Sequence, residues 1–537
     1  MSTTSSPAAA GRAGGTAADA ASEAARRRTF AIISHPDAGK TTLTEKFLLY
    51  AGALQEAGAV KARAGRRRAT SDWMELEQQR GISITSTVLQ FAYRDNVVNL
   101  LDTPGHRDFS EDTYRVLAAA DAAVMVLDVA KGIESQTLKL FEVCRSRALP
   151  VLTFINKMDR PGRDLLGLLD DIEDQIGLRA TPVTWPVGEA GDFRGVIDRR
   201  DGEFIRFGRS QRGALAATEE PMTPQAAAAA YGPLWSRAAE ECALLDEVGA
   251  SYEAKEFSSG ESSPLFVGSA LTNFGVRHLM DAVIDLCPSP GPQLDAAGVP
   301  RRLEAPFSGS VFKIQANMNP AHRDHMAFVR VCSGRFSRGE VLIHEPSGRP
   351  FATKYASSVM GAERSTVDEA WPGDIVGLVN AADLAIGDSL YLEAPVRYPK
   401  IATFAPELVA TAHPKDVSRH KKFAKGLEQL EREGVVQVLH RRGDDKTPVL
   451  AAVGQMQFEV FAHRMAQEFG APVDLSAYAT RTVRRTDEAT AAELRGLGGV
   501  EVLGRRDGTL LALFESPYWL ARVAGDHPEW TLDTIVT

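Results

Sequence analysis

A short apolar run followed by S-H-P-D-A-G-K-T-T constrains this chain more than any other feature. Residues 30–33 predict a short buried strand, residues 34–39 a tight turn, and residues 40–50 a helix. Gly39 allows the backbone to approach an anion closely, and the first amides of the helix point at that anion along the helix dipole. The pattern therefore predicts a P-loop in an α/β domain, where strands alternate with helices around a parallel sheet.

The side chains of this loop suit a nucleotide. Lys40 is placed to reach the β- and γ-phosphates, so we count it among the catalytic residues, and the Thr41 hydroxyl would take one position on Mg²⁺. The usual pattern opens with glycine, whereas this chain has Ser34, which is also small. The candidate nucleotide-binding residues of the loop are Ser34, His35, Pro36, Asp37, Ala38, Gly39, Lys40, Thr41 and Thr42.

The stretch D-T-P-G-H follows a second apolar strand, predicted over residues 97–101. Asp102, at the end of that strand, is placed to hold Mg²⁺ through water. Gly105 can offer its backbone amide to the γ-phosphate and suits a loop that moves when this phosphate leaves. His106 follows directly, where its side chain could orient or polarise the attacking water. We therefore predict that Gly105 and His106 act in catalysis.

A third stretch, R-G-I-S, completes the expected metal site. Ser83 would supply the second protein hydroxyl on Mg²⁺ from a mobile loop over residues 70–86. Thr is the commoner residue at that position, and Ser provides the same hydroxyl chemistry. The predicted metal ligands are therefore Thr41, Ser83 and Asp102.

The stretch N-K-M-D predicts the choice of base. It follows a buried strand over residues 151–155, and the Asp159 carboxylate can accept hydrogen bonds from the ring NH and the exocyclic amine of guanine. Adenine lacks that amine, so it would leave a buried acceptor unpaired, at a cost of about 1–3 kcal/mol. Asn156 would reach the ring nitrogen and hold neighbouring loops, and the stem of Lys157 would cover the base plane. After a strand predicted over 265–268, Ser269 and Ala270 of the S-A-L stretch would close the pocket with their backbone amides, and Leu271 is counted with them as nucleotide-binding.

Taken together, these motifs resemble the translational GTPases. The resemblance is carried by the P-loop, by W-M-E-L-E-Q-Q-R-G-I-S-I-T-S from residue 73 and by D-T-P-G-H-R-D-F-S-E-D-T-Y-R from residue 102. Pro36 in the P-loop, Ser83 in place of Thr, and H-R-D-F-S-E-D-T from His106 are most similar to the bacterial class II release factors, the peptide chain release factor 3 family.

The resemblance continues beyond the nucleotide-binding part. F-S-G-S-V-F-K-I-Q-A-N-M-N-P-A-H-R-D (307–324) looks like the second domain of that family. F-A-P-E-L-V-A (404–410), K-G-L-E-Q-L-E-R-E-G-V-V-Q-V (425–438) and V-G-Q-M-Q-F-E-V (453–460) look like its third domain. The match covers residues 27–480.

The resemblance implies an activity and partners. It implies a GTPase of translation termination that binds GTP, GDP and Mg²⁺, is stimulated by the ribosome through ribosomal RNA and proteins, and removes a class I release factor after peptide release. The sequence contains no G-G-Q tripeptide, the mark of factors that cleave peptidyl-tRNA. We expect a cytoplasmic monomer that binds neither a membrane nor DNA.

Changes in composition along the chain predict its organisation. The first residues are rich in Ala, Ser, Thr and Gly, which predicts disorder. C-P-S-P-G-P at 287–292 breaks helix and strand alike, and later residues first alternate apolar and polar positions and then mix strand and helix patterns. The expected units are a disordered tail (1–25), a GTP-binding domain (26–290) with an insertion (about 180–262) that includes a helical part (224–248), a β-barrel (300–398) and an α+β domain (400–537).

Composition narrows the class of protein further. No apolar run reaches the length of a membrane span. The four cysteines lie far apart without metal or disulfide spacing, so we expect buried thiols. The net charge of −9 argues against a surface coated with basic residues, although basic clusters occur at 61–68, 413–422 and 481–485 and could contact the ribosome.

Three alternatives stay open from the sequence. The first is a translocase similar to elongation factor G, or a ribosomal protection protein, whose further domains would have to follow residue 537. The second is a tRNA carrier similar to elongation factor Tu, whose third domain is a barrel, unlike the mixed pattern after Phe404. The third is a nucleotide-binding switch without useful hydrolysis, against which His106 and the magnesium residues argue.

Overall fold

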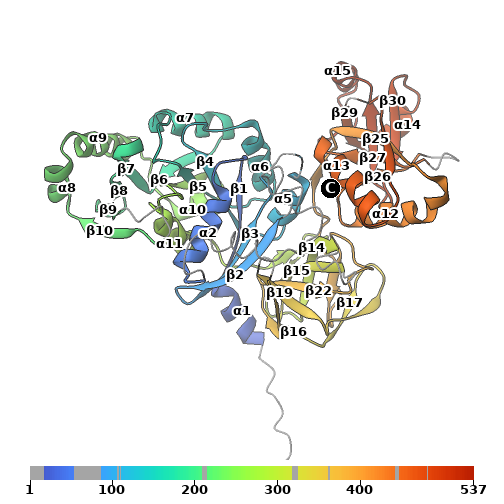
Figure 1. The fold of residues 1–537 in the computed structure, drawn as a ribbon, viewed down its shortest axis with the longest axis horizontal. Coiled ribbons are helices and arrows are strands. Elements are labelled where there is room, and N and C mark those ends of the chain that lie inside the picture. Colours follow the sequence, from blue (N-terminus) through green and yellow to red (C-terminus); the bar gives the residue numbers. More distant parts are fainter. Residues whose placement is uncertain are drawn as a thin grey trace, which may run out of the picture.

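The computed structural model describes residues 17–53, 86–105, 108, 110–208, 215–316, 325–360, 363–441, 447–480 and 482–536. They form a nucleotide domain, a barrel and a C-terminal region, coloured blue to green, yellow, and orange to red in Figure 1. The expected disorder of residues 1–25 is wrong for its second part, because Ala17–Ala25 form helix α1. Glu23 of this helix accepts a hydrogen bond from Arg27 at 2.6 Å, which ties the helix to the first strand. Residues 1–16 lie outside the described part.

Among the described residues, seven strands form the central sheet of the nucleotide domain, in the order β2-β3-β1-β4-β5-β11-β6. Neighbouring strands run parallel except β2 and β3, so the expected parallel sheet has one antiparallel edge strand. The strands are β1 (Arg27–Ser34), β2 (Thr87–Tyr93), β3 (Asn96–Asp102), β4 (Ala122–Asp128), β5 (Val151–Asn156), β6 (Arg179–Pro182) and β11 (Ser262–Val267). The parallel register brings the carboxyl ends of β1, β3, β4 and β5 to one edge, because Ile32 pairs with Asp102 and Asp128 with Asn156.

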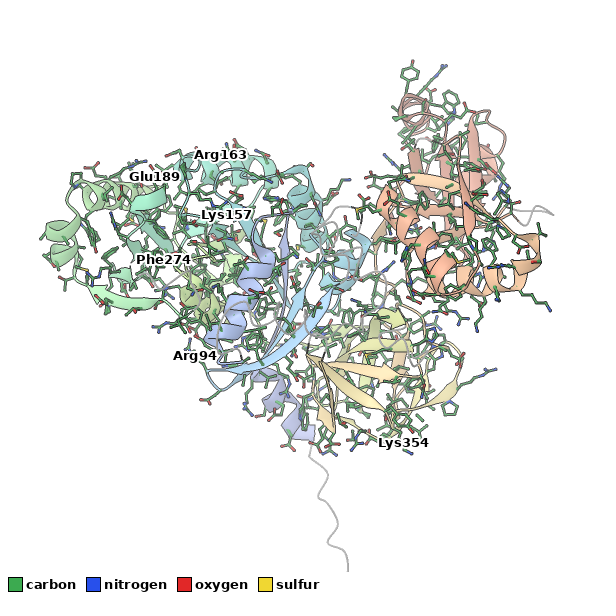
Figure 2. All side chains as sticks on the ribbon, viewed as in Figure 1. Arg94, Lys157, Arg163, Glu189, Phe274 and Lys354 are labelled. Carbon is green, nitrogen blue, oxygen red and sulfur yellow. The ribbon has the colours of Figure 1, made fainter. Side chains whose placement is uncertain are left out.

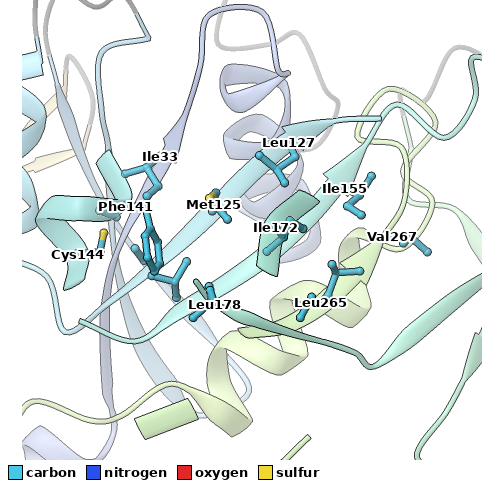
Figure 3. Packing of buried hydrophobic residues seen from close by; sticks show 14 of the residues in the cluster. Ile33, Met125, Leu127, Phe141, Cys144, Ile155, Ile172, Leu178, Leu265 and Val267 are labelled. Atoms are coloured by element: carbon cyan, nitrogen blue, oxygen red, sulfur yellow. The ribbon is translucent and has the colours of Figure 1, made fainter. Parts of the chain in front are cut away.

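Helices cover both faces of this sheet and bury its apolar residues. Phe47 of one helix set packs into the core on one face, and Phe141 and Ile172 pack into the core on the other, part of which is drawn in Figure 3. The first face carries α2 (Lys40–Tyr50), α10 (Ala254–Ser259) and α11 (Val276–Leu286), and the second carries α5 (Ser110–Leu117), α6 (Ser135–Ser146) and α7 (Leu165–Ile176). This double covering explains why the strands are nearly continuous apolar runs.

The chain between β6 and β11 builds a small sheet of its own, in the order β10-β9-β8-β7, with two helices packed on it. Its elements are β7 (Thr184–Val187), η2 (Ala190–Asp192), β8 (Gly195–Asp198), β9 (Phe204–Gly208), β10 (Thr218–Met222), α8 (Pro224–Tyr231) and α9 (Pro233–Glu247). The helical part expected over 224–248 therefore forms two helices, which meet at Gly232 and Pro233. Proline at the first helical position lacks the amide that would have no partner there.

The barrel is an antiparallel sheet of eight strands among the residues described, in the order β18-β17-β23-β14-β15-β22-β19-β20. Its interior is apolar and includes Val311, Val329, Leu342 and Val376. Its strands are β14 (Ser308–Ala316), β15 (His325–Ser333), β17 (Val341–His344), β18 (Arg349–Ala352), β19 (Ala356–Met360), β20 (Glu363–Thr366), β22 (Ile375–Val379) and β23 (Ser389–Tyr391), with the short pairs β12 (Gln293–Leu294) with β13 (Pro300–Arg301) and β16 (Phe336–Ser337) with β21 (Glu369–Ala370) beside them.

The C-terminal region combines strands and helices, as its sequence predicts. A four-stranded sheet of order β26-β27-β25-β28 carries the two main helices, and a further sheet of order β29-β31-β30 follows it. The elements are β24 (Thr403–Phe404), β25 (Leu408–Pro414), η4 (Val417–Arg419), α12 (His420–Arg432), β26 (Gln437–Leu439), β27 (Val449–Ala452), α13 (Gln455–Gln467), β28 (Val473–Ala477), β29 (Thr482–Thr486), α14 (Glu488–Leu494), β30 (Val500–Gly504), β31 (Leu510–Phe514), α15 (Pro517–Asp526) and β32 (Ile535–Val536). The second sheet lies in a stretch whose individual elements we did not predict from the sequence.

Composition predicts that the chain has no membrane span and that its four cysteines are buried thiols. In the described ranges, no helix combines the length and the apolar character that crossing a bilayer requires. All four cysteines are free; Cys144, Cys287 and Cys332 are buried, whereas Cys242 is only half-buried. The expectation of buried thiols is therefore corrected for Cys242, which lies on the surface helix α9.

Candidate nucleotide site

A cavity of about 310 Å³ lies at the carboxyl edge of the central sheet. Parallel strands collect their following loops at such an edge, which is where α/β sheets bind ligands. Every predicted P-loop residue except Ala38 lines the cavity, as do Gly105 and Arg160, the latter not predicted from the sequence. The other lining residues are Asn156, Lys157, Asp159, Ala270 and Leu271. Stretches that are far apart in the sequence thus surround one space.

The P-loop conformation depends on Gly39. Its φ of 100° lies in the region that favours glycine, and it is the residue immediately before α2. A Cβ atom there would lie 2.3 Å from Nδ2 of Asn156. Any side chain at position 39 would therefore both strain the backbone and push apart the P-loop and the N-K-M-D stretch.

Lys40 reaches across the cavity edge to the strand that carries the second motif. Its Nζ donates a hydrogen bond to the carbonyl oxygen of Thr103 and lies 3.3 Å from Oδ1 of Asp102. The Thr103 hydroxyl in turn donates to the carbonyl of Ile32 at 2.7 Å, next to the P-loop strand. The ammonium group of Lys40 thus touches the start of the D-T-P-G segment.

His35 lies on the cavity wall and is completely buried. Its Nδ1 lies 2.7 Å from Oε2 of Glu134, the residue before α6, although the alignment is outside hydrogen-bond geometry. Burial lowers the pKa of His35, and the attraction of Glu134 opposes this only partly. We therefore expect a neutral imidazole beside the phosphate side of the cavity at pH 7.

Asn156 connects three parts of the site. Its Nδ2 donates to the carbonyl of Ala38 at 2.8 Å, and its Oδ1 accepts the backbone N–H groups of Lys157 and Ala270, both at 2.8 Å. The predicted role of holding neighbouring loops agrees with these contacts. Ala38 does not line the cavity, and its carbonyl accepts the hydrogen bond from this amide.

Lys157 is held over the cavity by a residue outside the sequence motifs. Lys157 is labelled in Figure 2. Its Nζ donates to Oδ2 of Asp128 at 2.8 Å. Burial would raise the pKa of Asp128, but the hydrogen bonds from Lys157 and from the Ala130 amide outweigh it, so the pKa is lowered. Asp128 ends β4 beside Asn156, a position at a strand end that could have indicated its role.

Asp159 and Ser269 contact each other directly. The Ser269 hydroxyl donates to Oδ1 of Asp159 at 2.6 Å, and Oδ2 lies 3.8 Å from Nε of Arg160. The backbone amides of Ser269 and Ala270, which we predicted to close the pocket, both have acceptors within the protein. The Ser269 amide donates to Phe274 at 2.9 Å and the Ala270 amide to Asn156, since buried N–H groups need acceptors. Ser269 instead orients the carboxylate with its side chain.

Gly105 borders the phosphate side of the cavity. A Cβ atom placed on Gly105 would have the Cα of Pro36 as its nearest neighbour. The Gly105 carbonyl accepts a hydrogen bond from Nε2 of Gln136 at 3.3 Å, a contact that the sequence motifs do not predict. The predicted catalytic His106 and metal ligand Ser83 lie outside the described residues. The same holds for most of the expected mobile loop 70–86, for the basic cluster at 61–68 and for residue 481.

The residues present fit a magnesium ion bound together with phosphates. Oδ1 of Asp102 is buried and accepts no hydrogen bond among the residues described, although the Lys40 ammonium lies 3.3 Å away, so it can accept from a metal-bound water. Thr41 lines the cavity at the start of α2. The described ranges contain no group of three or more His, Cys, Asp or Glu side chains that could hold an ion alone. This donor set suits Mg²⁺, which binds one or two protein groups and keeps phosphate and water oxygens.

Family models match the chain in three consecutive parts. Residues 25–289 match the Elongation factor Tu GTP binding domain, and residues 306–393 match Elongation factor G domain 2. Residues 398–524 match the model described as Class II release factor RF3, C-terminal domain. The last match separates this chain from the elongation-factor alternatives.

Curated relatives extend over almost the whole chain. Peptide chain release factor 3 of Microcystis aeruginosa is 47% identical over 516 residues, which is 95% of each chain. That of Gloeobacter violaceus is 48% identical and covers 95% of this chain and 97% of its own. A crystal structure of a protein from Thermus thermophilus has the same fold, with a TM-score of 0.66 at 23% identity, over 90% of this chain and 72% of that one. The chain therefore belongs to the peptide chain release factor 3 family, the translation-termination branch of the translational GTPases.

Proposed function

We propose that this GTPase, stimulated by the ribosome, promotes the dissociation of class I release factors after the peptide has been released. The observation that carries the proposal is the convergence of the P-loop, D-T-P-G, N-K-M-D and S-A-L stretches on one cavity of about 310 Å³. That volume lies within the range of small-molecule sites. Family membership supplies the biological setting, and the geometry supports the chemistry.

Guanine selection rests on Asp159. Its carboxylate accepts two hydrogen bonds from the base edge, and the Ser269 hydroxyl at 2.6 Å holds it in one orientation without occupying all its lone pairs. The Lys157 stem covers the base plane, fixed at its far end by Asp128. Asn156 keeps the base loops at a set distance from the P-loop because it bonds to both.

Phosphate binding rests on the P-loop amides and on Lys40. The amides that begin α2 meet an anion with a favourable dipole, and the Lys40 ammonium exchanges its Thr103 contact for phosphate oxygens. Thr41, Ser83 and Asp102 would hold Mg²⁺, directly or through water, and this ion would neutralise charge on the β- and γ-phosphates.

Hydrolysis requires an oriented water in line with the bond between the γ-phosphorus and the bridging oxygen. We assign this task to His106, which orients the water and stabilises its developing charge, and we assign the hydrogen bond to the γ-phosphate to the Gly105 amide. The water oxygen bonds to the γ-phosphorus as the bond from that phosphorus to the bridging oxygen breaks. The electron pair of the broken bond stays on GDP, one proton of the water is transferred to a phosphate oxygen, and GDP and phosphate leave. In this family setting the ribosome helps place His106, as trans-acting partners do for other slow GTPases.

We propose that the chain acts as a monomer in the cytoplasm, where it meets ribosomes and class I factors, and that it binds no DNA. The net charge of −9 supports local rather than general contact with nucleic acid.

A turnover experiment tests the chemistry. GTP hydrolysis is measured with and without ribosomes for the parent, for His106→Ala, and for His527→Ala as a matched control, because His527 is 42% exposed and stacks on Trp530. We expect stimulated turnover to fall by about 10²–10⁴ for His106→Ala, with nearly unchanged nucleotide affinity. The control should equal the parent. Intact stimulation in His106→Ala would remove that residue from its assigned role.

A second experiment tests the biological step. A fluorescent class I release factor is bound to ribosomes after peptide release, and its dissociation is followed after addition of this protein with GTP or GDP. We expect faster dissociation with GTP than without the protein. Equal rates in all three conditions would refute the termination role while leaving the GTPase activity standing.

A further inference from the structure

Asp108 joins two parts of the molecule that are 348 residues apart in the sequence. Its Oδ2 accepts the backbone N–H of Met456 at 2.8 Å, and Asp108 is only 5% exposed. Met456 is the second residue of α13, and the first amides of a helix have no acceptor within it. A carboxylate there satisfies an amide and interacts favourably with the positive end of the helix dipole. Asp108 of the nucleotide domain thus caps a helix of the C-terminal region.

The C-terminal region is shaped to receive this carboxylate. A Cβ atom on Gly454, the residue before α13, would lie 2.0 Å from Cγ of Asp108. Gln457 completes the cap from within, because its Oε1 accepts the amides of Val453 at 2.7 Å and Gly454 at 3.3 Å. The Gln457 side chain therefore accepts from the amides of the two residues before α13, while the Met456 amide donates to Asp108.

Two more polar contacts lie beside this cap, on helix α5. Oε1 of Glu111 accepts from Nε2 of Gln437 at 2.6 Å, and Nη1 of Arg115 donates to the carbonyl of Gly434 at 3.3 Å. Glu111 and Arg115 are also paired with each other at 3.2 Å, and the side chains of both are less than a tenth exposed. The C-terminal region thus contacts Asp108 and α5, which directly follow the D-T-P-G segment.

The same segment begins at the phosphate side of the cavity. The Lys40 ammonium donates to the Thr103 carbonyl, and Gly105 lines the cavity three residues before Asp108. A phosphate in the cavity would compete with the Thr103 carbonyl for the Lys40 ammonium. Only two residues of the sequence separate Gly105 from the buried Asp108, so we expect a displacement of residues 103–105 to reach Asp108.

We propose that Asp108 is a positioning residue that couples the phosphates in the cavity to the placement of the C-terminal region, through the N-terminus of α13. This proposal rests on the proposed GTPase function and names the contact through which that site communicates. We expect the cap to be more stable with one nucleotide than with the other. Loosening the cap then changes the relative affinity for the two nucleotides, because such coupling is reciprocal.

The test loosens the cap from either side in the full chain. Asp108→Ala removes the carboxylate, and Gly454→Ala inserts a methyl group against it; the φ of −149° at Gly454 tolerates alanine, so the clash is the main change. Gly525→Ala is the matched control, because a Cβ there meets nothing within 4 Å. Dissociation constants for GDP and GTP are measured by titration with fluorescent nucleotides, without ribosomes.

We expect Asp108→Ala and Gly454→Ala to change the ratio of the GDP and GTP dissociation constants in the same direction, by about fivefold or more. The double variant should change it no more than one single variant does, since both act on one contact. Asp108→Asn keeps an acceptor oxygen of the same reach and should restore part of the parent ratio. Gly525→Ala should leave the ratio unchanged.

A parent-like ratio in both Asp108→Ala and Gly454→Ala would overturn the proposal, as would additive effects in the double variant. A variant that loses its helical circular dichroism is replaced by its counterpart on the other side of the contact. If the parent bound neither guanine nucleotide, the proposed function itself would fail, and this result is distinct from an unchanged ratio.

Discussion

The barrel and the C-terminal region both dock on the nucleotide domain, but on parts of it that differ in character. The barrel contacts β1 and β3 of the central sheet, whereas the C-terminal region contacts Asp108 and α5, which follow the cavity-lining Gly105. Figure 1 shows the barrel beneath the sheet and the C-terminal region to one side of it. The barrel is thus attached to the strands of the central sheet. The C-terminal region is attached to the segment after Gly105, which is expected to move.

Asp374 is the centre of the barrel attachment. Its Oδ2 accepts from Nε of Arg27 at 2.8 Å, and its Oδ1 accepts from Gln90 at 3.1 Å and Asn99 at 3.2 Å. The Thr29 hydroxyl donates to the adjacent Gly373 carbonyl at 2.8 Å. These partners lie on β1, β2 and β3 and do not line the cavity.

Two contacts of the barrel lie outside this pattern. Arg330 of β15 donates to the Ala119 carbonyl, which follows α5, at 2.6 Å. Lys313 of β14 donates to the hydroxyl of Ser86 at 2.7 Å and lies 3.8 Å from Oδ2 of Asp112 on α5. The Ser86 amide also donates to Asp112, at 3.0 Å. The barrel therefore has a firm contact with the sheet and a second contact near the segments that surround the nucleotide. We therefore expect nucleotide-dependent change first at the C-terminal region and only secondarily at the barrel.

The largest expected effect is on stability, at the sheet contact. Asp374→Ala leaves the Arg27 guanidinium, whose side chain is 7% exposed, without its carboxylate partner in the barrel. We expect the free energy of unfolding to fall by roughly 3–5 kcal/mol. The relative affinity for GDP and GTP should not change.

Urea unfolding and nucleotide titration measure these two quantities. Asp368→Ala is the matched control from the same barrel, because Asp368 is 75% exposed and pairs with Arg338 on the surface. If Asp374→Ala were as stable as this control, or changed nucleotide selectivity, the barrel would not be a fixed attachment.

The second prediction concerns pH at the Lys313 contact. Burial raises the pKa of Asp112, but the charge of Lys313 and the hydrogen bonds from Ser86 outweigh it, so the pKa is lowered. A carboxyl with a lowered folded-state pKa stabilises above its unfolded value of about 3.9 and loses this contribution as the pH falls through the folded-state value. Asp112→Asn should therefore cost about 1.5–3 kcal/mol at neutral pH and progressively less below about pH 4.

Urea titrations of both proteins at several pH values measure this difference. A difference that stayed constant down to about pH 3 would show that the charge of Asp112 contributes nothing to the contact.

The cavity could be predicted from the sequence because each of its parts is local. Gly39, Lys40, Asn156 and Asp159 each lie within a few residues of a strand end, and parallel strands bring those ends to one edge. The strand pattern and the spacing of each stretch therefore contain enough information. Fold class follows in the same way, from apolar runs that alternate with helical periods.

The other features of the site and of the domain contacts depend on residues that are far apart in the sequence. Neither Asp128 nor Gln136 belongs to a motif, and their roles follow from where Lys157 and Gly105 are placed in three dimensions. The side-chain role of Ser269 could not be separated from a backbone role without knowing that Phe274 takes its amide. No local pattern links Asp108 to Met456, because the cap depends on how two folded units dock.

The third prediction concerns a hydrogen bond at the C-terminal attachment. Gln437→Leu removes the donor to Glu111, which keeps Arg115 as a partner, so we expect a loss of only about 1 kcal/mol in the free energy of unfolding. The ratio of GDP and GTP dissociation constants should nevertheless shift. Gln90→Leu is the matched control at the barrel attachment, where it removes donors to Asn99 and Asp374 and should leave the ratio unchanged.

Both variants are compared by urea unfolding and nucleotide titration. If they shifted the ratio equally, the distinction between a fixed and a responsive attachment would be lost. If neither shifted it, the coupling would be confined to Asp108.

The smallest effect is expected at the exposed edge of the C-terminal attachment. Lys139 on α6 lies 2.7 Å from Oε1 of Glu407, and the side chains are 54% and 55% exposed. Water and salt screen such a pair, so Lys139→Ala should change the free energy of unfolding by about 0.2–1 kcal/mol. A double-mutant cycle with Glu407→Ala measures the coupling at low and at about 1 M salt, where it should vanish. A coupling that persisted in high salt, or a change in nucleotide selectivity, would mean that the whole face of contact responds to the nucleotide, and not only its buried part around Asp108 and α5.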